Sequence, residues 1–145
     1  MADSVKDSID IEARADELFQ AAIDFESYPS WADGVKKVEV KERDDEGRPL
    51  KVWWQVDAKV KTITYTLQYD YSSAPESFSW KLVEGDLNSL EGSYTFDEFG
   101  DTTDVTYEMT ADLGFPVPGF IKRQGEKQIV RTALEGLKKR VASQG

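Results

Sequence analysis

The sequence predicts an α+β protein in which a curved, seven-stranded antiparallel sheet wraps around one long C-terminal helix. The first observation is an alternation of apolar and polar residues that recurs in short segments between residues 5 and 113, as is typical of half-buried strands. The second is an apolar stripe at helical spacing, formed by Val130, Leu134, Leu137 and Val141. The helix, residues 118–142, would be roughly 37 Å long. A helix of that length needs a sheet to cover its apolar side.

The elements follow one another in a simple order. The first strand is expected at residues 5–13, where Val5, Ile9 and Ile11 share one face. Two short helices follow between residues 16 and 31, and Pro29 marks the second, because proline cannot continue one helix but can begin another. Further strands are expected at residues 35–43, 50–60, 63–71, 78–82, 90–96 and 105–113. Short turns favour an antiparallel meander, and almost every strand has one apolar face, so the sheet is covered on one side only.

The composition limits the chemistry available to the protein. The length predicts a single domain, residues 1–145, and 39% of the residues are hydrophobic, which is enough for a substantial core. The absence of cysteine and histidine excludes disulfides, thiol and imidazole catalysis, and the zinc sites that need these ligands. We therefore assign no catalytic residue and expect neither a metal nor another cofactor.

Charge and hydropathy indicate the kind of partner. A net charge of −10 disfavours nucleic acid, because its phosphates would be repelled. There is no signal-peptide pattern at the N-terminus and no apolar run long enough to span a membrane, so we expect a cytoplasmic protein without a transmembrane segment. Residues 118–145, in contrast, carry a net charge of +5, from seven Lys/Arg and two Asp/Glu. This basic helix face is either simply solvated or a transient contact surface for a protein or a membrane.

The apolar face of the predicted sheet is rich in large aromatic residues, whereas a core between strands and a helix is usually built from Leu, Ile and Val. The helix opposite contains Gly125 and Gly136, each of which costs about 1 kcal/mol relative to alanine. Either these glycines allow close packing, or they and the aromatic residues enclose a cavity for a hydrophobic small molecule. The predicted ligand-binding residues are Trp54, Tyr65, Trp80, Tyr94, Tyr107, Phe115, Phe120, Ile129 and Ala133.

The segment that joins the last strand to the long helix, residues 113–120, is unusually apolar. Its two prolines and two glycines indicate a loop, and Phe115, Val117 and Phe120 give it a hydrophobic surface. One interpretation is a structural contact that fixes the start of the helix. The other is a movable lip at the entrance of a pocket, able to admit a ligand or to contact a membrane or a protein.

The order of these elements, with Tyr28-Pro29-Ser30-Trp31 after the first helix and Ser89-Leu90-Glu91-Gly92-Ser93-Tyr94 in the sixth strand, resembles the START-like, or SRPBCC, superfamily and its helix-grip fold. The chain is most similar to the polyketide cyclase/dehydrase-like and coenzyme-Q-binding START-like proteins. The resemblance covers essentially the whole chain. It implies a cavity between the sheet and the long helix that holds lipids, quinones, sterols or polyketides.

Three functions are compatible with these features. The leading hypothesis is a binding or carrier protein for a hydrophobic small molecule such as a lipid, a quinone or a polyketide. The resemblance also implies an alternative, a polyketide cyclase or dehydratase, which requires an ionisable group inside the cavity. By strand parity, the carboxylates of Asp57, Asp70, Glu91 and Glu108 fall on the polar face instead. A third possibility is a protein-interaction module whose interior is filled.

Overall fold

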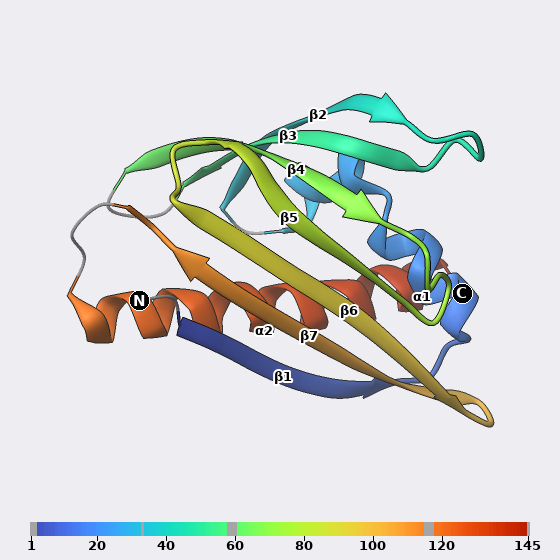
Figure 1. Cartoon of the computed structure of the whole chain (residues 1–145). Coiled ribbons are helices and arrows are strands. Elements are labelled where there is room, and N and C mark those ends of the chain that lie inside the picture. Colours follow the sequence, from blue (N-terminus) through green and yellow to red (C-terminus); the bar gives the residue numbers. More distant parts are fainter. Residues whose placement is uncertain (1–2, 33, 58–60, 115–117, 145) are drawn as a thin grey trace.

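The computed structural model describes residues 3–32, 34–57, 61–114 and 118–144. It confirms the predicted α+β architecture, with one curved sheet and a long C-terminal helix (Figure 1). The elements are β1 (Asp3–Ile11), α1 (Ala15–Ala22), the 3₁₀ helix η1 (Phe25–Ser30), β2 (Val35–Arg43), β3 (Pro49–Asp57), β4 (Thr62–Asp70), β5 (Ser77–Gly85), β6 (Ser89–Phe99), β7 (Thr102–Asp112) and α2 (Gly119–Gln144).

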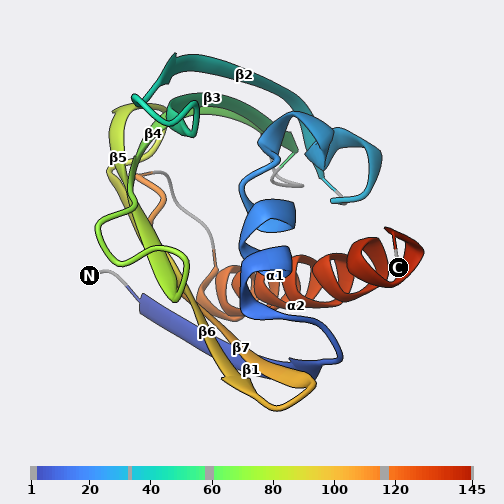
Figure 2. The same cartoon turned by 90° about the vertical axis from the view of Figure 1, so that its right-hand side faces the viewer.

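The seven strands form a single antiparallel sheet in the order β1-β7-β6-β5-β4-β3-β2. Strands β2 to β7 make the predicted meander, and β1 then pairs with β7, from Asp3 opposite Ala111 to Ile11 opposite Thr103. The sheet curves strongly, and α1 and α2 both lie on its concave side (Figure 2). Most of the buried strand residues therefore face the two helices, and most of the exposed ones face outward.

Helix α2 forms because its apolar residues repeat at the helical period and are covered by the sheet. Val130, Leu134 and Leu137 are each at most 1% exposed, and Val141 is also buried, as the stripe predicted. Helix α1 fills another part of the concave side. The Phe19 ring of α1 lies 5.7 Å from the Phe78 ring of β5 in an edge-to-face arrangement, which favours tight packing of the two elements.

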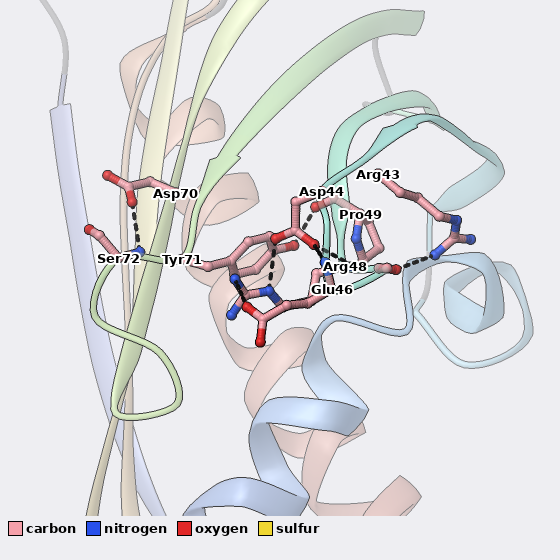
Figure 3. A network of polar contacts seen from close by, with 9 residues as sticks. Arg43, Asp44, Glu46, Arg48, Pro49, Asp70, Tyr71 and Ser72 are labelled. Carbon is pink, nitrogen blue, oxygen red and sulfur yellow. Dashed lines mark hydrogen bonds and ion pairs between the residues drawn. The ribbon is translucent and has the colours of Figure 1, made fainter.

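A polar network holds the β2–β3 hairpin against the end of β4 (Figure 3). The Asp44 carboxylate accepts hydrogen bonds from the backbone N–H groups of Glu46 and Arg48, at 3.0 and 2.9 Å, and pairs with the Arg48 side chain at 2.8 Å. The Arg48 guanidinium lies 4.8 Å from the centre of the Tyr71 ring. The Tyr71 hydroxyl donates a hydrogen bond to the carbonyl of Pro49. The network thus fixes the turn of the hairpin beside the end of β4.

The two helix glycines differ in their surroundings. A Cβ atom at Gly136 would lie 2.4 Å from two carbons of the Trp31 indole, so this glycine allows the ring to pack directly on the helix backbone. A Cβ atom at Gly125 would meet no described atom within 4 Å. Close packing therefore explains Gly136, although the partner is the residue after η1 and not a strand. Among the described residues, the space that a Cβ atom at Gly125 would occupy is open.

Candidate functional site

The centre of the concave face is a wall of aromatic rings from β5, β6 and β7. Trp80 lies 5.5 Å from Tyr107, and Tyr107 meets Tyr94 edge to face at 4.9 Å between ring centres. The Trp80 indole also covers Gly92 on the neighbouring strand, where a Cβ atom would come within 2.6 Å of the ring. All three rings are at least nine-tenths buried. Because Gly92 has no side chain, Trp80 can lie close to the sheet at this point.

The wall continues to β3 through rings that the sequence analysis did not assign to the site. Phe25 of η1 lies 4.5 Å from Tyr69 and 5.5 Å from Trp54, and Tyr69 lies 5.9 Å from Trp80. Tyr65 is the direct cross-strand partner of Trp54 and is half-buried. The structure therefore brings together the five predicted sheet residues, namely Trp54, Tyr65, Trp80, Tyr94 and Tyr107, and adds Phe25 and Tyr69.

The indole N–H of Trp54 is a buried hydrogen-bond donor without an acceptor among the described residues. The indole N–H lies near the Tyr69 hydroxyl and offsets part of the rise that burial causes in the Tyr69 pKa, but the two groups are not in hydrogen-bonding geometry. A buried donor without an acceptor costs about 1–3 kcal/mol and is rare in native proteins. Trp54 Nε1 is therefore a point at which a bound molecule could gain a hydrogen bond.

Several tyrosine hydroxyls gather in the same interior. Burial raises the pKa of Tyr28, Tyr69, Tyr94 and Tyr107 well above the ordinary value, and proximity to other tyrosines adds to the rise. Tyr28 donates a hydrogen bond of 2.5 Å to the carbonyl of Ala22, and its pKa rise is partly offset by a hydrogen bond from Tyr94. The hydroxyls therefore stay protonated at neutral pH. They form a polar lining that carries no charge.

One ionisable pair lies on the buried side of α2. Glu126 is only 4% exposed and lies one helical turn before the buried Val130. The Lys122 ammonium lies 3.2 Å from Glu126 Oε2 and donates a 3.1 Å hydrogen bond to the carbonyl of Ala111 in β7. The other carboxylate oxygen, Oε1, is buried without a hydrogen-bond partner among the described residues. The predicted buried stripe of this helix begins at Val130. Extending it by one turn toward the N-terminus of the helix would have identified Glu126 as a buried residue from the sequence.

The predicted helix residues have different positions. Ala133 is half-buried and packs against the core. Ile129, which we predicted to contact the ligand, is 48% exposed, because it is displaced by about 100° around the helix from Val130. It lies two turns before Gly136 and thus on the side of α2 that Trp31 covers further along. Phe115 lies outside the described residues, as does the side chain of Phe120, so neither residue can be placed at the site.

The polar side of the sheet contains a broad, open hollow of about 700 Å³. Its lining includes the outward side chains of β4 to β7, among them Gln68, Asp70, Lys81, Glu91 and Glu108. Acidic side chains outnumber basic ones in it, and it lacks the apolar enclosure that a hydrophobic ligand needs. The concave face is the better candidate for the functional site.

The curved antiparallel sheet packs around a long C-terminal helix, and a buried aromatic wall lies on its concave face. This arrangement is the START-like, helix-grip fold. The chain belongs to the polyketide cyclase/dehydrase and lipid transport family, whose model matches residues 11–138. No curated protein matches the chain by sequence. Within the described residues, no helix is both long and apolar enough to cross a membrane.

Solved structures of similar fold cover the whole chain. A START superfamily protein from Mycobacterium smegmatis has 21% sequence identity and a TM-score of 0.87, covering 98% of this chain and 99% of its own. A protein from Thermus thermophilus has 22% identity and a TM-score of 0.85, covering 99% of both chains. The Zhui aromatase/cyclase from a Streptomyces species has 16% identity and a TM-score of 0.76, covering 97% of this chain and 96% of its own. At these identities the likeness concerns the fold alone.

Proposed function

We propose that the protein binds a hydrophobic small molecule between the aromatic concave face of the sheet and helix α2, and that it acts as a carrier. The observation that carries this proposal is the wall formed by Trp54, Trp80, Tyr94 and Tyr107, with its buried polar tips. Burial of about 300 Å² of apolar ligand surface contributes roughly 7 kcal/mol before the cost of immobilising the ligand. The indole N–H and the hydroxyls then select the orientation.

The ionisation states of the site favour binding over catalysis. Tyrosine hydroxyls whose pKa is raised by burial are poor proton donors to a leaving group at neutral pH. Glu126 is the buried carboxylate on the inner side of α2, and Lys122 already holds one of its oxygens. The described site therefore lacks a matched acid and base, and a carrier function requires neither.

The test is identification of the bound molecule. The protein is purified from its own source organism without detergent and measured by native mass spectrometry, and any co-purified compound is extracted and identified. A stoichiometric lipid, quinone or polyketide supports the carrier proposal and names the ligand class. If the mass is that of the bare chain, and the recombinant protein also binds no hydrophobic probe in equilibrium dialysis, the proposal fails. In that case an interaction module with a filled interior becomes the better explanation.

A second candidate function, dehydration or cyclisation of a polyketide, is favoured by Glu126, since this reaction requires an ionisable group in the interior. The carboxylate would take a proton from the carbon beside a ketone, and the carboxylic acid so formed would give this proton to the hydroxyl group on the next carbon, which leaves as water while a carbon–carbon double bond forms. The test is turnover of a short β-hydroxy ketone thioester by the wild type and by Glu126→Gln. Turnover that is lost in the variant, while binding persists, supports the enzyme. Equal, background-level rates in both proteins contradict it.

A further inference from the structure

The inner side of α2 contains an unfilled hydrogen-bond acceptor, and it lies in the interior that the proposed function assigns to the ligand. The Glu126 side chain is 5% exposed, and its Oε1 atom has no hydrogen-bond partner within the described part of the chain. Leaving such an atom buried and unpaired is costly, more so for a charged group than for a neutral one. A partner that arrives with the ligand would remove this cost.

Lys122 and Glu126 lie at one end of the aromatic wall. Lys122 contacts Ala111, which is four residues after Tyr107 on the same face of β7 and so about 13 Å further along the strand. Helix α2 runs in the opposite direction to β7 (Figure 1), and Glu126 is one helical turn further along α2 than Lys122. We take the ligand to be a rigid molecule of two or three rings that contacts both the wall and the carboxylate.

The charges of the pair define the chemical group that fits. Lys122 and Glu126 together carry no net charge, so the site gives no reason to attract a charged ligand. For a charged group, attraction to one member of the pair is opposed by repulsion from the other. A ketone or quinone oxygen can only accept hydrogen bonds, so it cannot pair with Oε1. A neutral hydroxyl group can donate to it, and hydrogen bonds to an ionised acceptor are the strong ones.

We propose that Glu126 Oε1 accepts a hydrogen bond from a hydroxyl group of the ligand, so that the site selects hydrophobic alcohols or phenols over equally apolar ketones, quinones and ethers. This inference rests on the proposed ligand-binding function. It narrows the ligand class from hydrophobic molecules in general to those with a hydroxyl group at one end.

The test uses two probes of the same ring system, 2-naphthol and 2-methoxynaphthalene, which differ in whether they can donate a hydrogen bond. Equilibrium dialysis gives the Kd of each probe for the wild type and for the double variant Lys122→Met/Glu126→Met. The double variant replaces the whole buried pair with apolar side chains of similar volume, a change that proteins usually tolerate. Glu135→Met, on the exposed side of the same helix, is the matched control.

The wild type and the control variant are expected to bind 2-naphthol at least about tenfold more tightly than 2-methoxynaphthalene. In the double variant the two Kd values should agree within about twofold, because only the naphthol loses a partner. Equal affinities in the wild type, or an unchanged preference in the double variant, overturn the inference and leave the binding function intact. If the wild type binds neither probe, the proposed binding function fails together with the inference.

Discussion

The indole of Trp31 lies directly against Gly136 of α2, where an added Cβ atom would come within 2.4 Å of the ring. The same indole lies 4.5 Å from the Tyr28 ring, and Tyr28 in turn reaches the carbonyl of Ala22. This contact joins the residue that follows η1 to the C-terminal half of the long helix.

Replacement of Gly136 by alanine should therefore destabilise the protein. The new methyl group would force the Trp31 indole off the helix, at a cost of about 1–3 kcal/mol, which exceeds the gain of about 1 kcal/mol in helix propensity. The measurement is the free energy of unfolding in urea. Gly125→Ala is the matched control, since its methyl group meets no described atom within 4 Å, and it should raise stability. Equal effects of the two substitutions would show that the Trp31 contact is unimportant.

The aromatic wall should control ligand affinity. Tyr94→Leu removes a ring that is 2% exposed and contacts Trp80 and Tyr107, so it should weaken the binding of a hydrophobic ligand by roughly tenfold, the loss of about 1.4 kcal/mol. The domain should remain folded by circular dichroism. Trp53→Leu, on the opposite face of β3, removes an even larger ring and should leave the affinity unchanged. An unaltered Kd for Tyr94→Leu would show that the ligand does not bind at this wall.

Stability should fall steeply in alkali because of the tyrosines. The pKa is raised for all six of them, in each case chiefly by burial: Tyr28, Tyr65, Tyr69, Tyr71, Tyr94 and Tyr107. The unfolded chain loses these protons near pH 10 and the folded chain only at higher pH, so their contribution is complete below pH 10 and is lost above it. Each tyrosine adds about 1.4 kcal/mol per pH unit to the slope.

Tyrosinate absorbance and circular dichroism, followed together between pH 8 and pH 12, measure this effect. The tyrosines should ionise in one step that coincides with unfolding. Ionisation of several tyrosines near pH 10 in a chain with intact secondary structure would contradict the burial of their hydroxyls.

The hydroxyl of Tyr71 should stabilise the β2–β3 hairpin. Tyr71 is only 7% exposed, and Tyr71→Phe leaves the Pro49 carbonyl without its 2.5 Å hydrogen bond, so the substitution should cost about 1–3 kcal/mol. Thermal denaturation gives the change in Tm. Tyr65→Phe is a suitable control because the Tyr65 hydroxyl makes no hydrogen bond to a described residue. A loss of similar size in both variants would mean that the ring environment, and not this hydrogen bond, is responsible.

The sequence was sufficient to predict most of the fold, because periodicity depends only on which face of an element is covered. The alternation of apolar and polar residues predicted the strands to within a few residues of their observed ends. The same alternation indicated which sheet residues point inward, such as Trp80 and Tyr94. The pairing of β1 with β7 was not predicted, since no local pattern records which distant edge a strand will join.

The helix side of the site was harder to predict. Ile129 was expected to face the interior because it is apolar, and Glu126 was overlooked because charged residues are usually exposed. The direction in which each residue points around the helix axis decides whether it is buried. Glu126 lies one turn from Val130 and so on the same side of α2, whereas Ile129 is displaced from Val130 by about 100°. The contact between Trp31 and Gly136 joins residues about 100 positions apart, so it could be recognised only in three dimensions.

The pairing of β1 with β7 also affects how the chain matures during synthesis. The two partners are about 100 residues apart, and at roughly 5–20 residues per second the first strand leaves the ribosome several seconds before its partner exists. During that interval the unpaired backbone of β1 is open to pairing with other chains, which is a general route to aggregation. The many long-range strand contacts place its folding in the millisecond-to-second range. A polar, charged first strand such as Asp3–Ile11 limits the risk of wrong pairing during this wait.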